Sequence, residues 1–199
     1  MNSMNEEVYQ LVETAADMYE NGKDINEVLS VIHRAVDLSK ECIDKDFCKE
    51  NRIAFYYSII MECDFTLGTS REDKVQQIIE AIILALDDEI NHEFDETVIT
   101  LYAYSLRLNY LCLKDKNDAD SIKRAYALIR NARWKYNLLF IKSDFNNEFE
   151  KARSYYYMFE LTTIDLIEVA KKANMRKKYD LFKKELNEMQ KMFSIKYKE

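Results

Sequence analysis

The chain has 199 residues, of which 48% are hydrophobic and 33% charged, which suits one soluble globular domain with a core of its own. It contains no proline and only two glycines, and this argues against a many-stranded sheet, whose turns depend on such residues. No apolar run approaches the roughly 18 residues of a membrane-spanning helix. The polar, acidic opening residues do not form a signal peptide, so we expect a cytoplasmic protein with no membrane partner.

The net charge of −7 is unevenly distributed along the chain. Residues 1–100 contain 23 acidic and 8 basic side chains, whereas residues 101–199 contain 13 acidic and 21 basic ones. An acidic first half disfavours binding to nucleic acid or to an anionic membrane there. The basic residues of 171–199 either solvate the end of the fold, which we favour, or dock an acidic partner.

Apolar residues recur at the spacing of an amphipathic helix along nearly the whole chain, and no stretch alternates with a period of two. The pattern therefore predicts a protein made only of helices. The expected helices span residues 5–21, 25–43, 48–67, 71–88, 95–114, 119–137, 145–173 and 176–197.

Capping signals mark two of the breaks between these helices. Asp24-x-x-Glu27 and Thr69-x-x-Glu72 have the spacing of capping boxes, with an acceptor at the N-cap and an acid three residues later. A glycine precedes each box by one or two residues and can adopt the left-handed conformation that ends the previous helix.

Several positions recur 46 residues apart. A fixed period of this size is typical of helical repeat arrays, in which each unit buries its apolar face against its neighbours. The recurring alanines are expected to be buried where two helices approach closely. The recurring positions are Tyr19-x-x-Gly22 and Phe65-x-x-Gly68, followed by Ala35, Ala81 and Ala127.

An aromatic residue and a glycine at the end of one helix, followed by a small residue in the next, resemble the tetratricopeptide repeat. The period of 46 rather than about 34, the absence of proline and the missing tryptophan signature mark a divergent member. The resemblance implies a right-handed α-solenoid of about four antiparallel helix pairs in a single domain, residues 1–199. Its units would span about 1–46, 47–92 and 93–138, with 139–199 as the C-terminal capping unit. An irregular helical bundle and a three-helix armadillo unit are the alternatives.

Tyrosine, with 14 copies, is the enriched side chain, and it clusters on the first helix of each of the last three pairs. In stacked helix pairs the first helices line the concave surface, where tyrosine offers a rigid apolar body and a polar tip. Core packing is the alternative role for these rings. The expected partner-binding residues are Tyr56, Tyr102, Arg107, Asn109, Arg153 and Tyr156.

Catalytic and metal-binding motifs are not evident. Glu89-x-x-His92 is a single E-x-x-H, whereas a di-iron bundle needs two. Two glycines 46 residues apart allow no phosphate-binding loop, and the four cysteines form no CxxC pair. We therefore expect no enzyme, no cofactor, no metal and reduced thiols. Trp134, among basic residues, is expected to seal the joint between the third and fourth helix pairs rather than to stack on bases.

These features favour a noncatalytic protein- or peptide-binding module, regulatory or adaptor in role, with a tyrosine-lined concave groove. The first alternative is a compact helical bundle with a structural or homodimeric role. The second is a nucleic-acid-associated protein that uses the basic C-terminal segment, although the acidic first half makes nucleic acid the less favoured partner.

Overall fold

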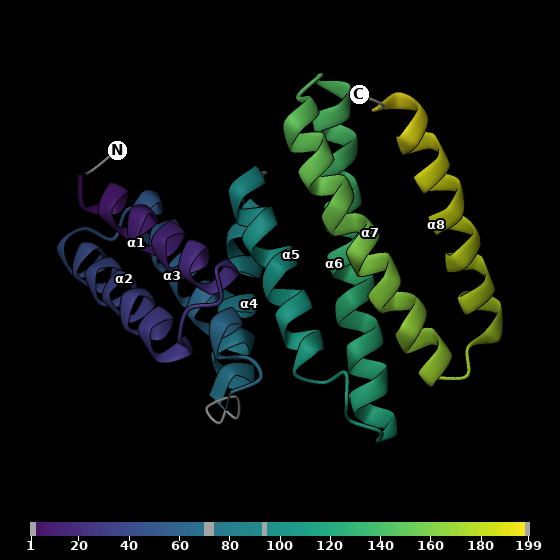
Figure 1. Ribbon diagram of the computed structural model, residues 1–199, viewed down its shortest axis with the longest axis horizontal. Helices are drawn as coiled ribbons and strands as arrows, with labels where there is room; N and C mark the ends of the chain where they lie inside the picture. Colours follow the sequence, from purple (N-terminus) through teal and green to yellow (C-terminus); the bar gives the residue numbers. More distant parts are fainter. Residues whose placement is uncertain (1–2, 70–73, 93–94, 198–199) are drawn as a thin grey trace. The chain divides into compact units, whose positions relative to one another are not determined.

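The structure, a computed structural model, describes residues 3–69, 74–92 and 95–197 (Figure 1). Helical residues make up 87% of this part of the chain, which contains no strand, so the prediction of an all-α protein is confirmed. Its helices are α1 (Ser3–Glu20), α2 (Ile25–Lys45), α3 (Lys49–Thr66), α4 (Val75–His92), α5 (Glu96–Leu111), α6 (Ala119–Phe145), α7 (Phe149–Lys172) and α8 (Arg176–Lys196).

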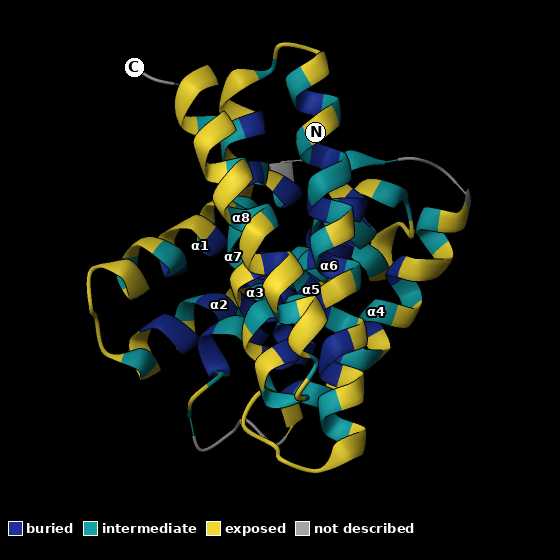
Figure 2. Cartoon of the chain, turned by 90° about the vertical axis from the view of Figure 1, so that its right-hand side faces the viewer, coloured by how far each residue is buried: buried dark blue, intermediate teal, exposed yellow. Residues whose placement is uncertain are grey.

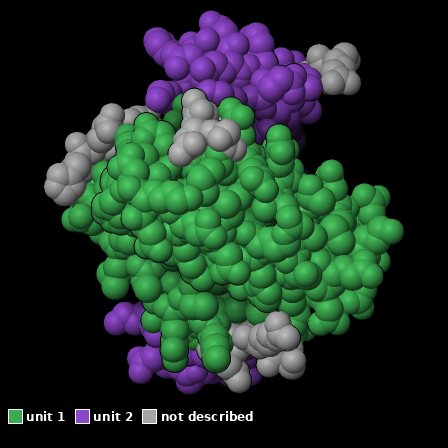
Figure 3. Space-filling model, turned by 90° about the vertical axis from the view of Figure 1, so that its left-hand side faces the viewer, with its two compact units in different colours: residues 1–101 green, residues 102–199 purple. Residues whose placement is uncertain are grey.

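The chain divides into two compact units, residues 1–101 and residues 102–199 (Figure 3). The division falls within α5. The charge asymmetry of the sequence follows this division, because unit 1 contains the acidic half of the chain and unit 2 the basic half.

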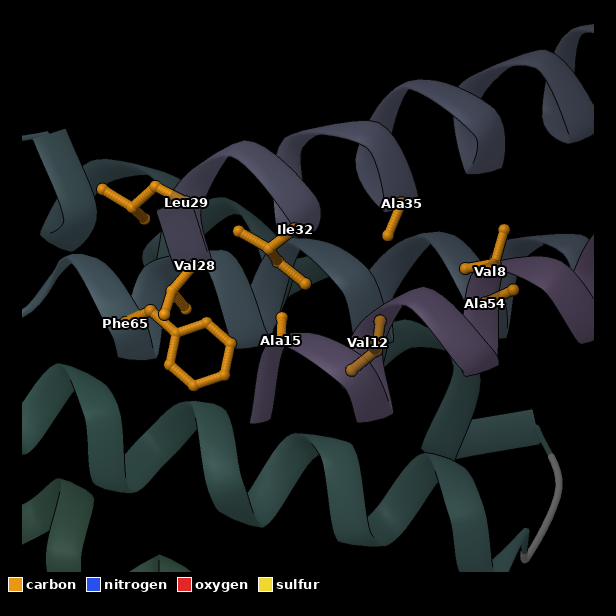
Figure 4. Close-up of a cluster of buried hydrophobic side chains, with 9 residues drawn as sticks. All are labelled: Val8, Val12, Ala15, Val28, Leu29, Ile32, Ala35, Ala54 and Phe65. Atoms are coloured by element: carbon orange, nitrogen blue, oxygen red, sulfur yellow. The ribbon is translucent and has the colours of Figure 1, made fainter. Parts of the chain in front are cut away.

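The core of unit 1 lies between its first three helices, each of which contacts the other two. Figure 4 shows the apolar side chains that meet there, and α3 also packs against α4. Burial of such aliphatic surface is the main favourable contribution to folding. The cluster comprises Val8, Val12 and Ala15 of α1, Val28, Leu29, Ile32 and Ala35 of α2, and Ala54 and Phe65 of α3.

The core of unit 2 centres on the long contact between α6 and α7, and α8 packs against α7. Both long helices bury an aromatic ring almost completely, Tyr136 from α6 and Phe159 from α7. In α8, Phe182 is the buried residue, and most of the remaining positions are exposed (Figure 2).

Three helices end in the same backbone geometry, with one residue at positive φ. That residue is Gly22 after α1 (φ 67°), Asn147 after α6 (φ 61°) and Asn174 after α7 (φ 54°). In each case the amide that follows bonds the carbonyl five positions before it, as in Lys23 N to Met18 O at 3.0 Å. This is the pattern of a Schellman motif, in which asparagine can take the place of glycine.

The observed helix bounds differ most from the expected ones where an asparagine, rather than a glycine, ends the helix. The helix expected to end at residue 137 continues to Phe145, because nothing between these positions breaks a helix and Asn147 provides the stop. Similarly, α7 begins at Phe149 rather than 145. The start expected for α4 at residue 71 lies outside the described residues, as does Glu72, the partner of Thr69 in the expected capping box.

The pattern of buried positions in one helix is repeated in a later helix, but the sequence distance between matching positions is not constant. Buried positions of α2 match those of α4 at a distance of 47 residues, and those of α5 match those of α7 at a distance of 54. In α2 and α4 the matched buried residues are Val28, Ile32, Ala35 and Ser39 with Val75, Ile79, Ile82 and Leu86. In α5 and α7 they are Val98, Tyr102, Ser105 and Asn109 with Ala152, Tyr156, Phe159 and Thr163.

The offset of 47 corrects the expectation for the alanines. Ala35 is fully buried, but Ala81 and Ala127 are exposed, and Ile82 occupies the buried position that matches Ala35. A shift of one residue turns a helix by about 100°, which moves a side chain from the core face to solvent.

Candidate functional site

The six expected partner-binding residues fall in different environments. Tyr56 belongs to unit 1 and is half-buried, whereas the other five belong to unit 2. Tyr102, Asn109 and Tyr156 are buried, with exposed fractions of 6%, 2% and 5%. These three side chains contribute to the interior of unit 2, which is the packing role left open as the alternative for the tyrosines.

Arg107 lies in a partly buried ion pair. Its Nε donates to Oδ2 of Asp165 at 2.8 Å, which links α5 to α7 within unit 2. Burial raises the pKa of Asp165, and the neighbouring Arg107 guanidinium opposes that shift. Arg107 is therefore held to α7 through its Nε, and 16% of its side chain is exposed.

Arg153 lines a shallow cleft of about 360 Å³ between α7 and α8 with Tyr156 and Phe193. Arg153 Nη2 donates to the carbonyl of Tyr197 at 3.3 Å. The rings of Tyr156 and Phe193 are stacked, with centroids 3.7 Å apart. Burial raises the pKa of Tyr156 to about 12. The end of α8 is therefore held to α7 by ring stacking and by the hydrogen bond from the Arg153 side chain to the Tyr197 carbonyl.

A second cleft, of about 490 Å³, lies in unit 1, and Tyr56 is part of its lining. Arg52 forms a two-pronged ion pair with Glu89, with Nε–Oε1 and Nη2–Oε2 distances of 2.7 and 3.3 Å. Lys49 pairs with Asp95 at 3.0 Å, and the Arg52 guanidinium lies over the ring of Phe47. Two of the three carboxylates that line this cleft are thus paired with its two cations, and Asp88 adds a further negative charge.

Trp134 does not seal a helix joint as expected, because 56% of its surface is exposed. It begins a row of apolar side chains along α6 that continues with Leu138, Ile141 and Phe145. Ile141 is 54% exposed and Phe145 85% exposed, and Leu138 is partly buried. The spacing of four, three and four residues places all four on one face of the helix. This row is called the α6 stripe below.

The opposite face of α6 carries the core of unit 2. Its buried residues include Ala125, Ile129, Ala132 and Leu139, which follow the same helical spacing. The helix is therefore apolar on two faces, one of which is buried in unit 2. The apolar spacing of the stripe can be read in the sequence from Trp134 to Phe145. It was missed because the helix was expected to end at residue 137.

Basic side chains flank the α6 stripe on both sides. Arg130 lies on one flank, and Lys135 and Lys142 lie on the other. The Lys135 ammonium is 5.0 Å from the centroid of the Trp134 ring, within the range of a cation–π contact. No acidic residue occurs in α6 between Ser121 and Ser143, and Asp144, beside Phe145 at the end of the stripe, is paired with Lys196.

The described residues contain neither a clustered set of metal ligands nor a membrane-spanning helix. In the described part of the chain, no group of three or more His, Cys, Asp or Glu side chains is arranged to hold a metal ion. The side chain of His92, the histidine of the single E-x-x-H, lies outside the described residues. Among residues 3–69, 74–92 and 95–197, no helix combines the length and the apolarity needed to cross a bilayer.

Comparisons with protein-family models, with curated proteins and with solved structures give no significant match to the chain.

Proposed function

We propose that the chain is a noncatalytic protein-binding module, a divergent tetratricopeptide-like α-solenoid with a regulatory or adaptor role in the cytoplasm. The repeat assignment is supported by the contact between Tyr19 and Phe65, two recurring aromatics whose ring centroids lie 5.1 Å apart. Each ends the first helix of its pair, as successive repeats in contact require.

The observation that carries the binding function is the α6 stripe. Monomeric proteins scatter single exposed apolar residues over their surface, but a continuous apolar row marks an interaction surface. Trp134 and Phe145 at its two ends are of the aromatic type enriched in binding hot spots. The proposal therefore places the partner on α6 rather than in a groove lined by the buried Tyr102 and Tyr156.

Association with nucleic acid is a second candidate function, favoured by the exposed Trp134 ring beside Lys135. Aromatic rings next to cations stack on unpaired bases, and such binding weakens steeply as salt is added. A homodimer formed stripe to stripe is disfavoured, because it would bring the cationic flanks of two copies together.

The test is partner capture from a nuclease-treated native lysate by the whole chain and by two variants. Ile141→Asp places a charge within the stripe, whereas Leu84→Asp changes a similarly exposed apolar residue on α4. We expect both variants to melt like the parent and only Ile141→Asp to lose the captured protein. Equal capture by the parent and Ile141→Asp would contradict the proposal, as would capture that requires nucleic acid.

A further inference from the structure

We propose that the α6 stripe binds an amphipathic α-helix of a partner protein whose apolar row is flanked by acidic side chains. This inference rests on the proposed function and specifies the chemical class of the partner.

The spacing of the stripe is that of a helix–helix contact. Extended towards the start of α6, the row continues through Asn131 to Ala127, so that six positions alternate in steps of four and three residues. This is the a and d pattern by which one helix packs along another. The row covers the 19 residues from Ala127 to Phe145, and its two ends are about 27 Å apart along the helix.

The positive charge beside the stripe favours a partner with negatively charged side chains. Along the row α6 carries basic residues on both sides, and the one acidic residue that flanks it within α6, Asp144 beside Phe145, forms an ion pair with Lys196. Arg133 points away from the stripe, because its guanidinium binds Glu185 at 2.7 Å and lies over the ring of Phe159. The remaining cations occupy positions like those flanking a coiled-coil seam, where opposite charges set partner choice. They are Lys123, Arg130, Lys135 and Lys142.

Other occupants match this surface less well. A second copy of the chain would oppose like charges at the stripe. A lipid surface is reached best by a helix with a broad apolar face, whereas the α6 stripe is a single row and the opposite face of the helix is buried in unit 2. A nucleic acid would engage Trp134 and the cations, but it leaves Ile141 and Phe145 without an apolar partner.

The experiment uses two labelled helical peptides of four heptads at nanomolar concentration, with leucine at a and d in both. One has glutamate and the other lysine at the e and g positions. Fluorescence anisotropy with the whole chain should show the acidic peptide binding at least about 10-fold more tightly than the basic one, because only its flanks complement α6. The preference should shrink as salt is raised.

Two variants locate the contact. Ile141→Asp should abolish acidic-peptide binding, and the double variant Arg130→Glu/Lys142→Glu should reverse the preference between the peptides. Leu84→Asp on α4 is the matched control and should leave binding unchanged. The melting temperature of each variant shows whether the chain is still folded. If the double variant does not fold, Arg130→Gln is the milder substitution, and it should weaken the preference for the acidic peptide.

Equal affinity for the two peptides, or no binding of either, would overturn the inference. So would tighter binding, through Ile141, to phosphatidylserine vesicles or to a 20-nucleotide single-stranded DNA. If Ile141→Asp still loses the protein captured from lysate while the peptides do not discriminate, the proposed function stands and the acidic helix is wrong. If Ile141→Asp retains that protein, the proposed function itself fails.

Discussion

The side-chain nitrogen of Asn5 donates a hydrogen bond to the side-chain oxygen of Asn51, 46 residues later, at 2.8 Å. Asn51 in turn donates from its Nδ2 to the carbonyls of Cys42 and Asp46, at 2.9 and 2.7 Å. Both asparagines are buried. One polar network therefore joins the start of α1 and the start of α3 to the end of α2.

Replacing Asn51 by alanine should lower the free energy of unfolding by about 2–4 kcal/mol, because it leaves Asn5 and the Asp46 carbonyl without their buried partner. Urea unfolding measures the loss. Asn5→Ala should cost less, and the Asn5→Ala/Asn51→Ala pair should be markedly non-additive, since the two side chains share one bond. Additive losses would show that the asparagines act independently.

The contrast between Ala35 and Ala81 gives a second prediction. Ala35→Leu should destabilise the chain by about 1–3 kcal/mol, because extra methylenes overfill a packed core. Ala81→Leu, at an exposed position on α4, should change stability by less than about 0.5 kcal/mol. Chemical unfolding of the two variants side by side makes the comparison. If both variants lost the same free energy of unfolding, Ala81 would be buried like Ala35, and the helices would match at a distance of 46 residues.

The fold class and most helix bounds could be predicted from sequence, because helical periodicity and capping are local properties. The Asp24 carboxylate accepts from the Asn26 amide at 2.9 Å and caps α2, where the sequence predicted a helix start. Gly22 and Gly68 likewise take the positive φ expected of them. These features depend only on residues within one turn of each other.

Which face of a helix is buried depends on distant residues, and here sequence reasoning was less successful. The alanine at position 81 matched Ala35 in type, but a one-residue change of offset placed Ile82 in the core instead. The α6 stripe was missed because the expected helix ended at residue 137, so that Ile141 and Phe145 were never placed on the same face as Trp134. Asparagine at a helix end is a weaker stop signal than glycine.

The helix end at Asn147 offers a test of that stop signal. Asn147→Gly should stabilise the chain by up to about 1 kcal/mol, since glycine adopts the left-handed conformation without the strain of a side chain. Asn147→Ala should destabilise it by about 1 kcal/mol. The adjacent Asn146, with φ −80°, is the control, and Asn146→Gly should not stabilise. Thermal melts rank the three variants, and stabilisation by Asn147→Ala would contradict the assignment.

The ion pair between Arg107 and Asp165 leads to a pH-dependent prediction. Burial raises the pKa of Asp165 above its usual range even with Arg107 beside it, so the folded chain holds this proton more tightly than the unfolded chain does. The stabilising contribution of such a group is fully present below the unfolded pKa near 3.8 and is lost as the pH rises through the folded pKa. Without Arg107 the folded pKa should rise further, because an opposing positive charge is removed.

Arg107→Leu should therefore cost about 3 kcal/mol at pH 7, where it leaves a buried carboxylate unpaired, and clearly less at pH 4.5, where Asp165 can take up a proton. Urea unfolding of parent and variant at both pH values measures the difference. In the Arg107→Leu/Asp165→Asn double variant no carboxylate is left to titrate, so the pH dependence of the loss should disappear. A loss for Arg107→Leu that is the same at pH 7 and pH 4.5 would mean that Arg107 stabilises the chain through packing of its aliphatic part and not through the charge of Asp165.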